Sequence, residues 1–163
     1  MKVLPDAATG WCLLTATGGH AGNDAAHGVI RRWTAPEAGT LKISGTLSHE
    51  SKNGDGVRGR LVSSRGGELA SWVAARSKAE TSLQGLVVEA GETIDFIVDC
   101  RSGPDSDGFQ WAPVLTLGGR DHDAASAFAG PVPPPPPPLA PWEKLAELLE
   151  SEGLKSNVQS VLK

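Results

Sequence analysis

The segment that most constrains this chain runs from residue 28 to residue 61, GVIRRWTAPEAGTLKISGTLSHESKNGDGVRGRL. Apolar residues recur at every second position, as they do in strands whose successive side chains point to opposite faces of a sheet. One face of the first expected strand holds Val29, Arg31 and Trp33, and one face of the second holds Leu41, Ile43, Gly45 and Leu47. Turn residues at 36–39 and 53–56 separate the strands, so the segment predicts three successive strands forming one wall of a sandwich.

Similar short runs continue on both sides of this segment. They cover residues 11–16, 67–75, 81–90, 92–100 and 109–117, and turn signals separate most of them. No convincing helical period lies between them, which argues against a parallel sheet with crossover helices. The sequence therefore predicts an all-β, antiparallel β-sandwich, jelly-roll-like, of about eight strands.

The pattern changes after residue 118. PVPPPPPPLAP predicts a stiff polyproline II spacer, and PWEKLAELLESEG predicts a short amphipathic helix. Such a helix is too short to be stable alone in water, so it needs a surface of this domain or of a partner. We expect a sandwich domain over 1–120, a linker over 121–140 and a helical tail over 141–163. The apolar docking stripe of the tail is Trp142, Leu145, Leu148 and Leu149.

Composition excludes two classes of partner. A net charge of -4 and a pI near 5.5 argue against a nucleic-acid binder, which needs a basic face to displace phosphate counterions. No run of 18 apolar residues is present, so no membrane span is expected. The N-terminus also lacks the apolar region of a secretion signal, which fits a cytoplasmic chain or a piece of a longer secreted protein.

The two cysteines leave the redox environment open. Cys100 is in phase with the apolar face of the expected strand 92–100, so its side chain is expected to point inward. Cys12 and Cys100 could pair in an oxidising compartment, but two buried thiols are favoured over a bridge.

Several sequence segments occur together in a fixed order: GGHAGNDAAHGVIRRWTAP, GDGVRGRLVSSRGGELASW, DFIVDCR, SDGFQWAP and PLAPWEKLAELL. Together they cover roughly residues 11–149, and the chain resembles a segment of the large planctomycete-type cytochrome c-domain proteins. The resemblance implies a carbohydrate-binding-module-like β-sandwich near the C-terminus of an exported parent, and so an extracytoplasmic or periplasmic location. No C-x-x-C-H motif occurs, so covalent haem is not expected in this chain.

The loop over residues 20–27 is the densest polar cluster of the chain. Its two histidines are seven positions apart, which fits no standard zinc pattern, while its amide and carboxylate oxygens suit calcium. Modules of the carbohydrate-binding kind often hold a structural calcium between an early loop and the last strand. The candidate calcium ligands are Asn23, Asp24, Asp105 and Asp107, and the favoured alternative is a loop held by Asx-turn hydrogen bonds.

For sugar binding, an exposed indole would stack on the face of a pyranose ring. The candidates are Trp72 and Trp111, with burial in the core as the favoured alternative for each. A glycosidase would need two carboxylates across a cleft, but Asp95 and Asp99 are roughly 13 Å apart along one strand. No catalytic constellation is indicated, so we expect a non-catalytic accessory module that binds a polysaccharide or glycan. The alternative is an assembly module that docks other subunits or domains through the proline spacer and helical tail.

Overall fold

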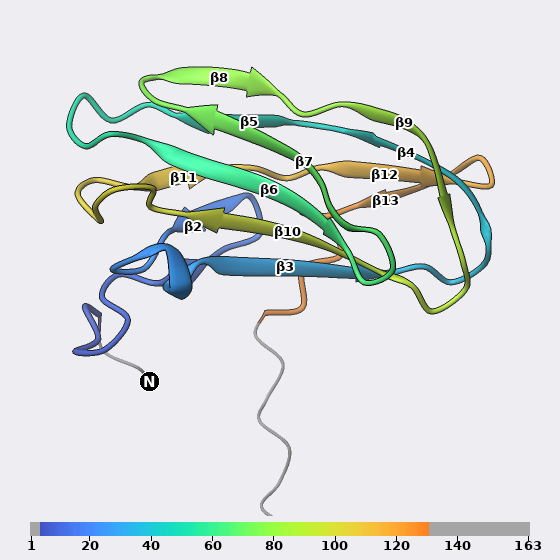
Figure 1. The fold of residues 1–163 in the computed structure, drawn as a ribbon, viewed down its shortest axis with the longest axis horizontal. Helices are drawn as coiled ribbons and strands as arrows, with labels where there is room; N and C mark the ends of the chain where they lie inside the picture. The colour runs from blue at the N-terminus through green and yellow to red at the C-terminus, as the bar shows by residue number, and fades with distance from the viewer. Residues whose placement is uncertain (1–3, 131–163) are drawn as a thin grey trace, which may run out of the picture. The chain divides into compact units, whose positions relative to one another are not determined.

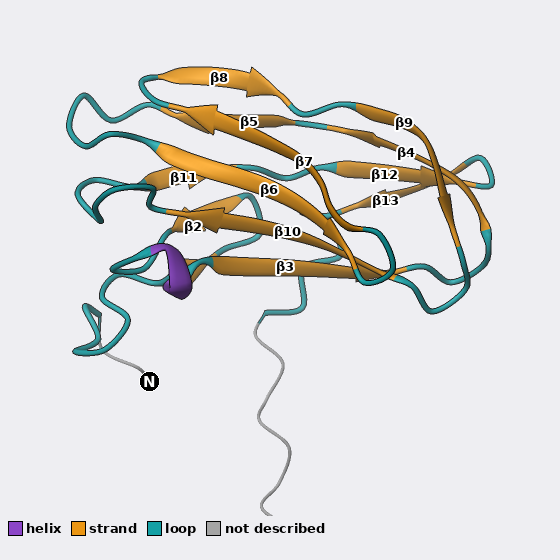
Figure 2. Cartoon of the chain, viewed as in Figure 1, coloured by secondary structure: helices purple, strands orange, loops and turns teal. Residues whose placement is uncertain are grey.

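The computed structural model describes residues 4–130, which form an all-β fold with three antiparallel sheets (Figure 1, Figure 2). Within this range the helical structure is one 3-10 turn, η1 (Ala25–His27). The β6 sheet has the order β3-β10-β6-β7, with β3 (Val29–Thr34), β6 (Val57–Ser63), β7 (Gly67–Ala74) and β10 (Thr93–Asp99). The β5 sheet has the order β1-β2-β11-β5-β8, with β1 (Leu13–Leu14), β2 (Gly18–His20), β5 (Thr46–His49), β8 (Ser77–Glu80) and β11 (Gly108–Gln110). The β4 sheet has the order β13-β12-β4-β9, with β4 (Gly39–Ser44), β9 (Leu83–Val88), β12 (Val114–Leu117) and β13 (Arg120–Asp123).

The β4 and β5 sheets continue each other as one bent layer (Figure 1). Gly45 alone separates β4 from β5, while two residues separate β8 from β9 and three separate β11 from β12. The main-chain N–H of Thr81 donates to the oxygen of Gly45 (2.9 Å). A Cβ on Gly45 would lie 3.1 Å from Cα of Pro113, so a side chain there would crowd the neighbouring bend. The interruptions between β4 and β5, between β8 and β9 and between β11 and β12 therefore lie side by side, and the layer bends along them.

One apolar core joins this bent layer to the β6 sheet in a sandwich-like arrangement. From the β6 sheet the buried residues are Val29, Val57, Leu61, Ala74, Ile94, Phe96 and Val98. From the bent layer they are Leu41, Ile43, Leu47, Val88, Phe109, Trp111, Leu115 and Leu117. The alternation seen in the sequence thus places the expected residues inward, which confirms the all-β prediction and the inward faces of β3 and β4.

The prediction that residues 28–61 form three strands of one wall is wrong. The segment contains four strands, of which β3 and β6 lie in the β6 sheet, β4 in the β4 sheet and β5 in the β5 sheet. Alternation identifies the inward face of a strand, but both layers of a sandwich have an inward face. The pattern therefore could not assign each strand to its layer. The expected strand count of about eight was too low because the chain bends at Gly45 and before Val114, which divides two runs, and because β2, β8 and β13 lie outside the expected runs.

The turn over residues 53–56 has the backbone that its sequence predicts but another role. Gly54 (φ 77°) and Gly56 (φ 88°) both have the left-handed conformation that glycine adopts without steric cost. The turn joins β5 to β6, which lie in different sheets, so it is a connection between layers and not a hairpin.

The sandwich also extends past the predicted boundary at residue 120. β13 begins at Arg120 and pairs with β12, and the main-chain N–H of Ala124 donates to the oxygen of Pro113 (3.0 Å). β13 is an edge strand of polar residues, so it carries no apolar alternation that the sequence could reveal. The proline spacer and the tail stripe Trp142, Leu145, Leu148 and Leu149 lie outside the described residues and stay predictions. In the described part of the chain, no helix has the length and apolar character needed to cross a membrane.

Candidate functional site

The two tryptophans expected to stack on sugar are part of the core packing instead. Trp111 is 2 % exposed, and its indole N–H donates to the hydroxyl of Thr81 (2.9 Å). Its ring packs edge-on against Phe96 (5.3 Å between centroids) and against Trp72 (6.1 Å). Trp72 is half-buried and packs against the same cluster. The pair therefore does not form an open stacking face, as the core alternative predicted, because Trp72 of β7 and Trp111, which directly follows β11, both pack against the core.

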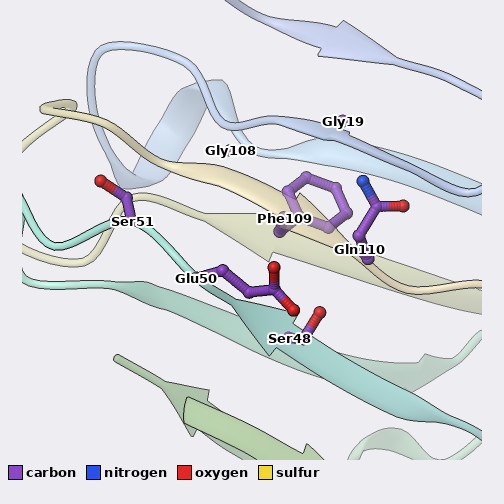
Figure 3. A pocket seen from close by; sticks show the side chains of 7 residues that line it. All are labelled: Gly19, Ser48, Glu50, Ser51, Gly108, Phe109 and Gln110. Carbon is purple, nitrogen blue, oxygen red and sulfur yellow. The ribbon is translucent and has the colours of Figure 1, made fainter. Parts of the chain in front are cut away.

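A shallow hollow of about 200 Å³ lies on the β5 sheet instead (Figure 3). It is lined by Gly19, Ser48, Glu50, Ser51, Gly108, Phe109 and Gln110. The antiparallel register places Gln110 opposite Ser48 on one side and opposite Gly18 on the other. Residues directly opposite each other share a face of the sheet, so polar side chains of β11 and β5 meet in this hollow.

Glycines keep the hollow open. A Cβ on Gly108 would meet no atom within 4 Å, so the space above this residue is free. On the neighbouring strand, a Cβ on Gly19 would lie 2.2 Å from the main-chain oxygen of Leu13 and 3.1 Å from the ring of Phe109 on the core side, so close packing requires glycine there. Backbone thus forms part of the floor, and a flat ligand can approach it closely.

The polar groups of the hollow can both donate and accept hydrogen bonds. Figure 3 shows the amide of Gln110 and the carboxylate of Glu50 on the two sides of the hollow. Gln110 is exposed, whereas Ser48 is 7 % exposed. The carboxylate of Glu50 lies 3.8 Å from Nζ of Lys78, and both side chains are largely exposed. An amide, a hydroxyl and a carboxylate beside an ammonium are the groups that recognise sugar hydroxyls.

An exposed indole lies next to this surface. Trp11 is 53 % exposed, and its ring centroid lies 6.5 Å from that of His20. Nδ1 of His20 donates to the main-chain oxygen of Ala21 (2.7 Å), because a carbonyl oxygen can only accept. This bond orients the imidazole, and His20 pairs in register with Gly108 of the hollow. The aromatic pair therefore lies one strand away from the polar groups.

The early loop is held by its own hydrogen bonds, as the Asx-turn alternative predicted. The carboxylate of Asp24 accepts from the main-chain N–H groups of Ala26 and His27 (2.8 and 3.1 Å) and caps η1. The side-chain hydrogen bond with His27 and these N–H donors lower the pKa of Asp24, although partial desolvation opposes them. The amide of Asn23 donates to the oxygen of Ala8 (3.3 Å). Asp24 is thus engaged within the loop, and Asn23 ties the loop to the N-terminal segment.

The two later candidates differ from each other. Asp105 accepts from the hydroxyl of Ser106 (3.0 Å). Asp107 is fully buried, and neither of its carboxylate oxygens has a hydrogen-bond partner. Burial, followed by the charges of Asp55 and Asp105, raises the pKa of Asp107 to about 7, although Arg101 opposes this shift. Among residues 4–130, no group of three or more His, Cys, Asp or Glu side chains is placed to hold a metal ion, and calcium at Asn23, Asp24, Asp105 and Asp107 stays a prediction.

The cysteines are both thiols in this structure. The Cys12 thiol donates to the main-chain oxygen of His27 (3.8 Å), and Cys100 is buried. Burial is the main cause that raises the pKa of the Cys100 thiol.

Sequence reasoning did not find Trp11, Glu50 or Gln110. Trp11 begins the short run WCLLTA, and its exposure follows from its position in a turn before β1. Gln110 alternates with Phe109 and Trp111, and that alternation was a usable sign of an outward polar side chain. Nothing in the sequence indicated that β5, β11 and β2 lie side by side.

Comparison of this chain with protein-family models, with curated proteins and with solved structures finds no match.

Proposed function

We propose that this chain is a non-catalytic accessory module that binds a polysaccharide or glycan on the outer face of the β5 sheet. The observation that carries the proposal is the open, polar, glycine-floored hollow with an exposed tryptophan beside it. The sequence resemblance to a carbohydrate-binding-module-like, jelly-roll-like segment of an exported cytochrome-type protein supports the same function. In that setting the module would work outside the cytoplasm and would hold its parent at a substrate.

The binding mode follows from the chemistry of the surface. The apolar face of a sugar ring stacks on Trp11, and neighbouring hydroxyls exchange hydrogen bonds with Gln110, Ser48 and Glu50. Because the hollow is open, it suits a residue within a longer chain as well as a chain end. Lys78 keeps Glu50 oriented and supplies further donors.

The test uses soluble β-glucan, xylan, mannan and chitin oligosaccharides in a glycan array, followed by calorimetric titration of any positive probe. Wild type should bind at least one probe. Gly108→Val places a side chain in the free space of the hollow, and Trp11→Ala removes the stacking surface. Each should weaken binding at least about tenfold, or about 1.4 kcal/mol.

Val73→Ala is the matched control, because Val73 is an exposed apolar residue of β7, outside the β5 sheet. Its affinity should equal that of wild type. The proposal fails if folded wild type binds none of the probes, or if Gly108→Val and Trp11→Ala bind as well as Val73→Ala does.

A further inference from the structure

A buried carboxylate without a partner is costly. Transfer of an ionised group from water to a protein interior costs several kcal/mol unless a counter-charge or hydrogen-bond donors replace the water. The other buried acids of the described chain have such partners: Asp99 contacts two arginines, and Glu92 accepts from the hydroxyl of Ser63 (2.6 Å). Asp107 has none on either oxygen, although it is 0 % exposed.

The surroundings of Asp107 are rich in oxygen atoms. Its Oδ1 lies 3.5 Å from the position that a Cβ would have at Gly54, and the main-chain oxygen of Asp105 lies beside the same position. The turn over residues 53–56 and the loop that ends at Asp107 are therefore in close contact here, with a carboxylate oxygen and a carbonyl oxygen beside Gly54. A Cβ at Gly54 would lie 2.0 Å from the main-chain oxygen of Asp105, so only glycine fits at this contact.

The nearby charges favour a cation and do not already supply one. Asp55 and Asp105 lie close enough to act on Asp107 electrostatically. The guanidinium of Arg101 is the nearest opposing charge, and it is engaged by the main-chain oxygen and the carboxylate of Asp55. Asp55 and Asp105 therefore add negative charge around Asp107, while Arg101, which opposes that charge, also pairs with Asp55.

We propose that Asp107 binds a calcium ion between the 53–56 turn and the loop before β11, with the main-chain oxygen of Asp105 and the carboxylate of Asp55 or Asp105 as further ligands. Calcium accepts carboxylate, carbonyl and water oxygens in irregular geometry, whereas magnesium requires a nearly ideal octahedron. Zinc is disfavoured because the proposed ligands are all oxygens, whereas zinc sites are built mainly from Cys and His. The site differs from the one predicted by sequence, since Asn23 and Asp24 are replaced by groups of the 53–56 turn.

The ion would stabilise the end of the sandwich where these connections meet (Figure 1). Asp107 immediately precedes Gly108, and the 53–56 turn follows Glu50 and Ser51 of the hollow. A bound calcium would therefore fix both chain segments that enter the hollow. The cation site does not depend on the proposed glycan binding, because it rests on Asp107 and its neighbours alone.

The experiment is a thermal melt of the purified protein in chelator and in calcium, with calorimetric titration of calcium chloride. Because the site has few charged ligands, we expect a Kd for calcium of about 10⁻⁴ to 10⁻³ M. At about ten times its Kd, calcium should raise the Tm by about 5 °C. Asp107→Asn should remove this rise, and magnesium at the same concentration should give a much smaller one.

Asp95→Asn is the matched control, since Asp95 lies on the outer face of the β6 sheet and pairs with Arg32. It should keep the calcium response of wild type. If Asp107→Asn does not fold, Asp55→Asn serves as the second variant and should weaken calcium binding about tenfold or more. The proposal is overturned if wild type shows no calcium-dependent rise in Tm, or if Asp107→Asn retains it. If removal of calcium changes only the glycan affinity and not the Tm, the cation site is also rejected.

Discussion

Two aspartates at the ends of the loop between β10 and β11 are equally buried and differ in their partners. Asp99 and Asp107 are both 0 % exposed. Asp99 lies 3.0 Å from a guanidinium nitrogen of Arg58 and 3.3 Å from Nε of Arg60, and it also accepts from the main-chain N–H of Arg101 (3.1 Å). Asp107 has no donor on either oxygen.

Asp99 therefore has a structural role, whereas the carboxylate of Asp107 has no protein partner and is available to a ligand. The arginines that neutralise Asp99 come from β6, the strand paired with β10. Asp107 instead lies beside a glycine turn and near other acids, and only the more distant charge of Arg101, which also pairs with Asp55, opposes its own within the described residues. Burial alone therefore does not indicate function, whereas burial without a counter-charge does.

The largest effect is expected from Asp99→Asn. The substitution leaves Arg58 and Arg60 beside a neutral amide and weakens the acceptor for Arg101, whose φ of 59° lies in the left-handed region. We expect a loss of about 2–3 kcal/mol in the free energy of unfolding, measured by urea denaturation. If the free energy of unfolding fell by less than about 0.5 kcal/mol, as for an exposed ion pair, the arginine partners would not stabilise Asp99 and its contrast with Asp107 would fail.

The second effect is the pH dependence of stability in calcium-free buffer. The pKa of Asp107 is raised to about 7 in the folded protein, from an ordinary value of 3.8. Below 3.8 both states hold the proton; as pH rises, the unfolded state releases it first, so this contribution to stability declines until the folded group ionises. Wild type should lose about 2 kcal/mol relative to Asp107→Asn between about pH 4.5 and pH 6.

Using the difference between these two proteins removes the opposite trends of acids whose pKa is lowered, such as Glu92 and Asp123. At saturating concentration, calcium should stabilise wild type and so reduce its loss in the free energy of unfolding relative to Asp107→Asn at alkaline pH. The assignment to Asp107 would be contradicted if wild type gained stability relative to Asp107→Asn as pH rises, or if the two proteins kept the same difference in stability at every pH.

The third effect is the change caused by Asp107→Asn itself without calcium. The amide removes a buried charge, but it remains a buried polar group, so the gain is only partial. At about pH 8 we expect the variant to be more stable than wild type by about 1 kcal/mol in urea denaturation. The comparison with Asp99 would fail if both asparagine variants were destabilised to the same extent.

The smallest effect is expected from Asp95→Asn. Asp95 pairs with Arg32 through two hydrogen bonds (2.8 and 2.7 Å), but the arginine side chain is 60 % exposed. Solvent screens such a pair, so the loss should be about 0.5 kcal/mol or less and should shrink in high salt. Urea denaturation at two salt concentrations measures this loss in the free energy of unfolding. A loss as large as that of Asp99→Asn would show that burial does not decide how much an ion pair stabilises this fold.

The sequence predicted the strand content well because that information is local. The alternation that places Leu41 and Ile43 inward, and the glycines that need positive φ at 54 and 56, depend on residues close together in the chain. The strands β2, β8 and β13 were missed because they are short, have few apolar residues and lie at or near an edge, so no apolar period marks them.

The candidate site was harder to predict. Asp107 was identified as a calcium ligand candidate, but of its predicted partners Asn23 donates to the oxygen of Ala8 and Asp24 accepts from N–H groups of its own loop. The groups beside Asp107 come from a turn more than fifty positions earlier in the chain, and sequence spacing carries no information on such contacts. The buried position of Trp111 was similarly undecided until β11 was placed against β5.

The sequence by itself determined that this chain forms antiparallel strands, which side chains those strands bury and where its glycine turns lie, because these properties follow from local sterics and from the period of apolar residues. Tertiary structure alone decided which strands share a sheet, that Trp72 and Trp111 meet in the core, and that polar groups of three strands form one hollow. It also decided that one buried aspartate has arginine partners and the other has none. These outcomes depend on contacts between distant parts of the chain, which exist only once the two layers pack together.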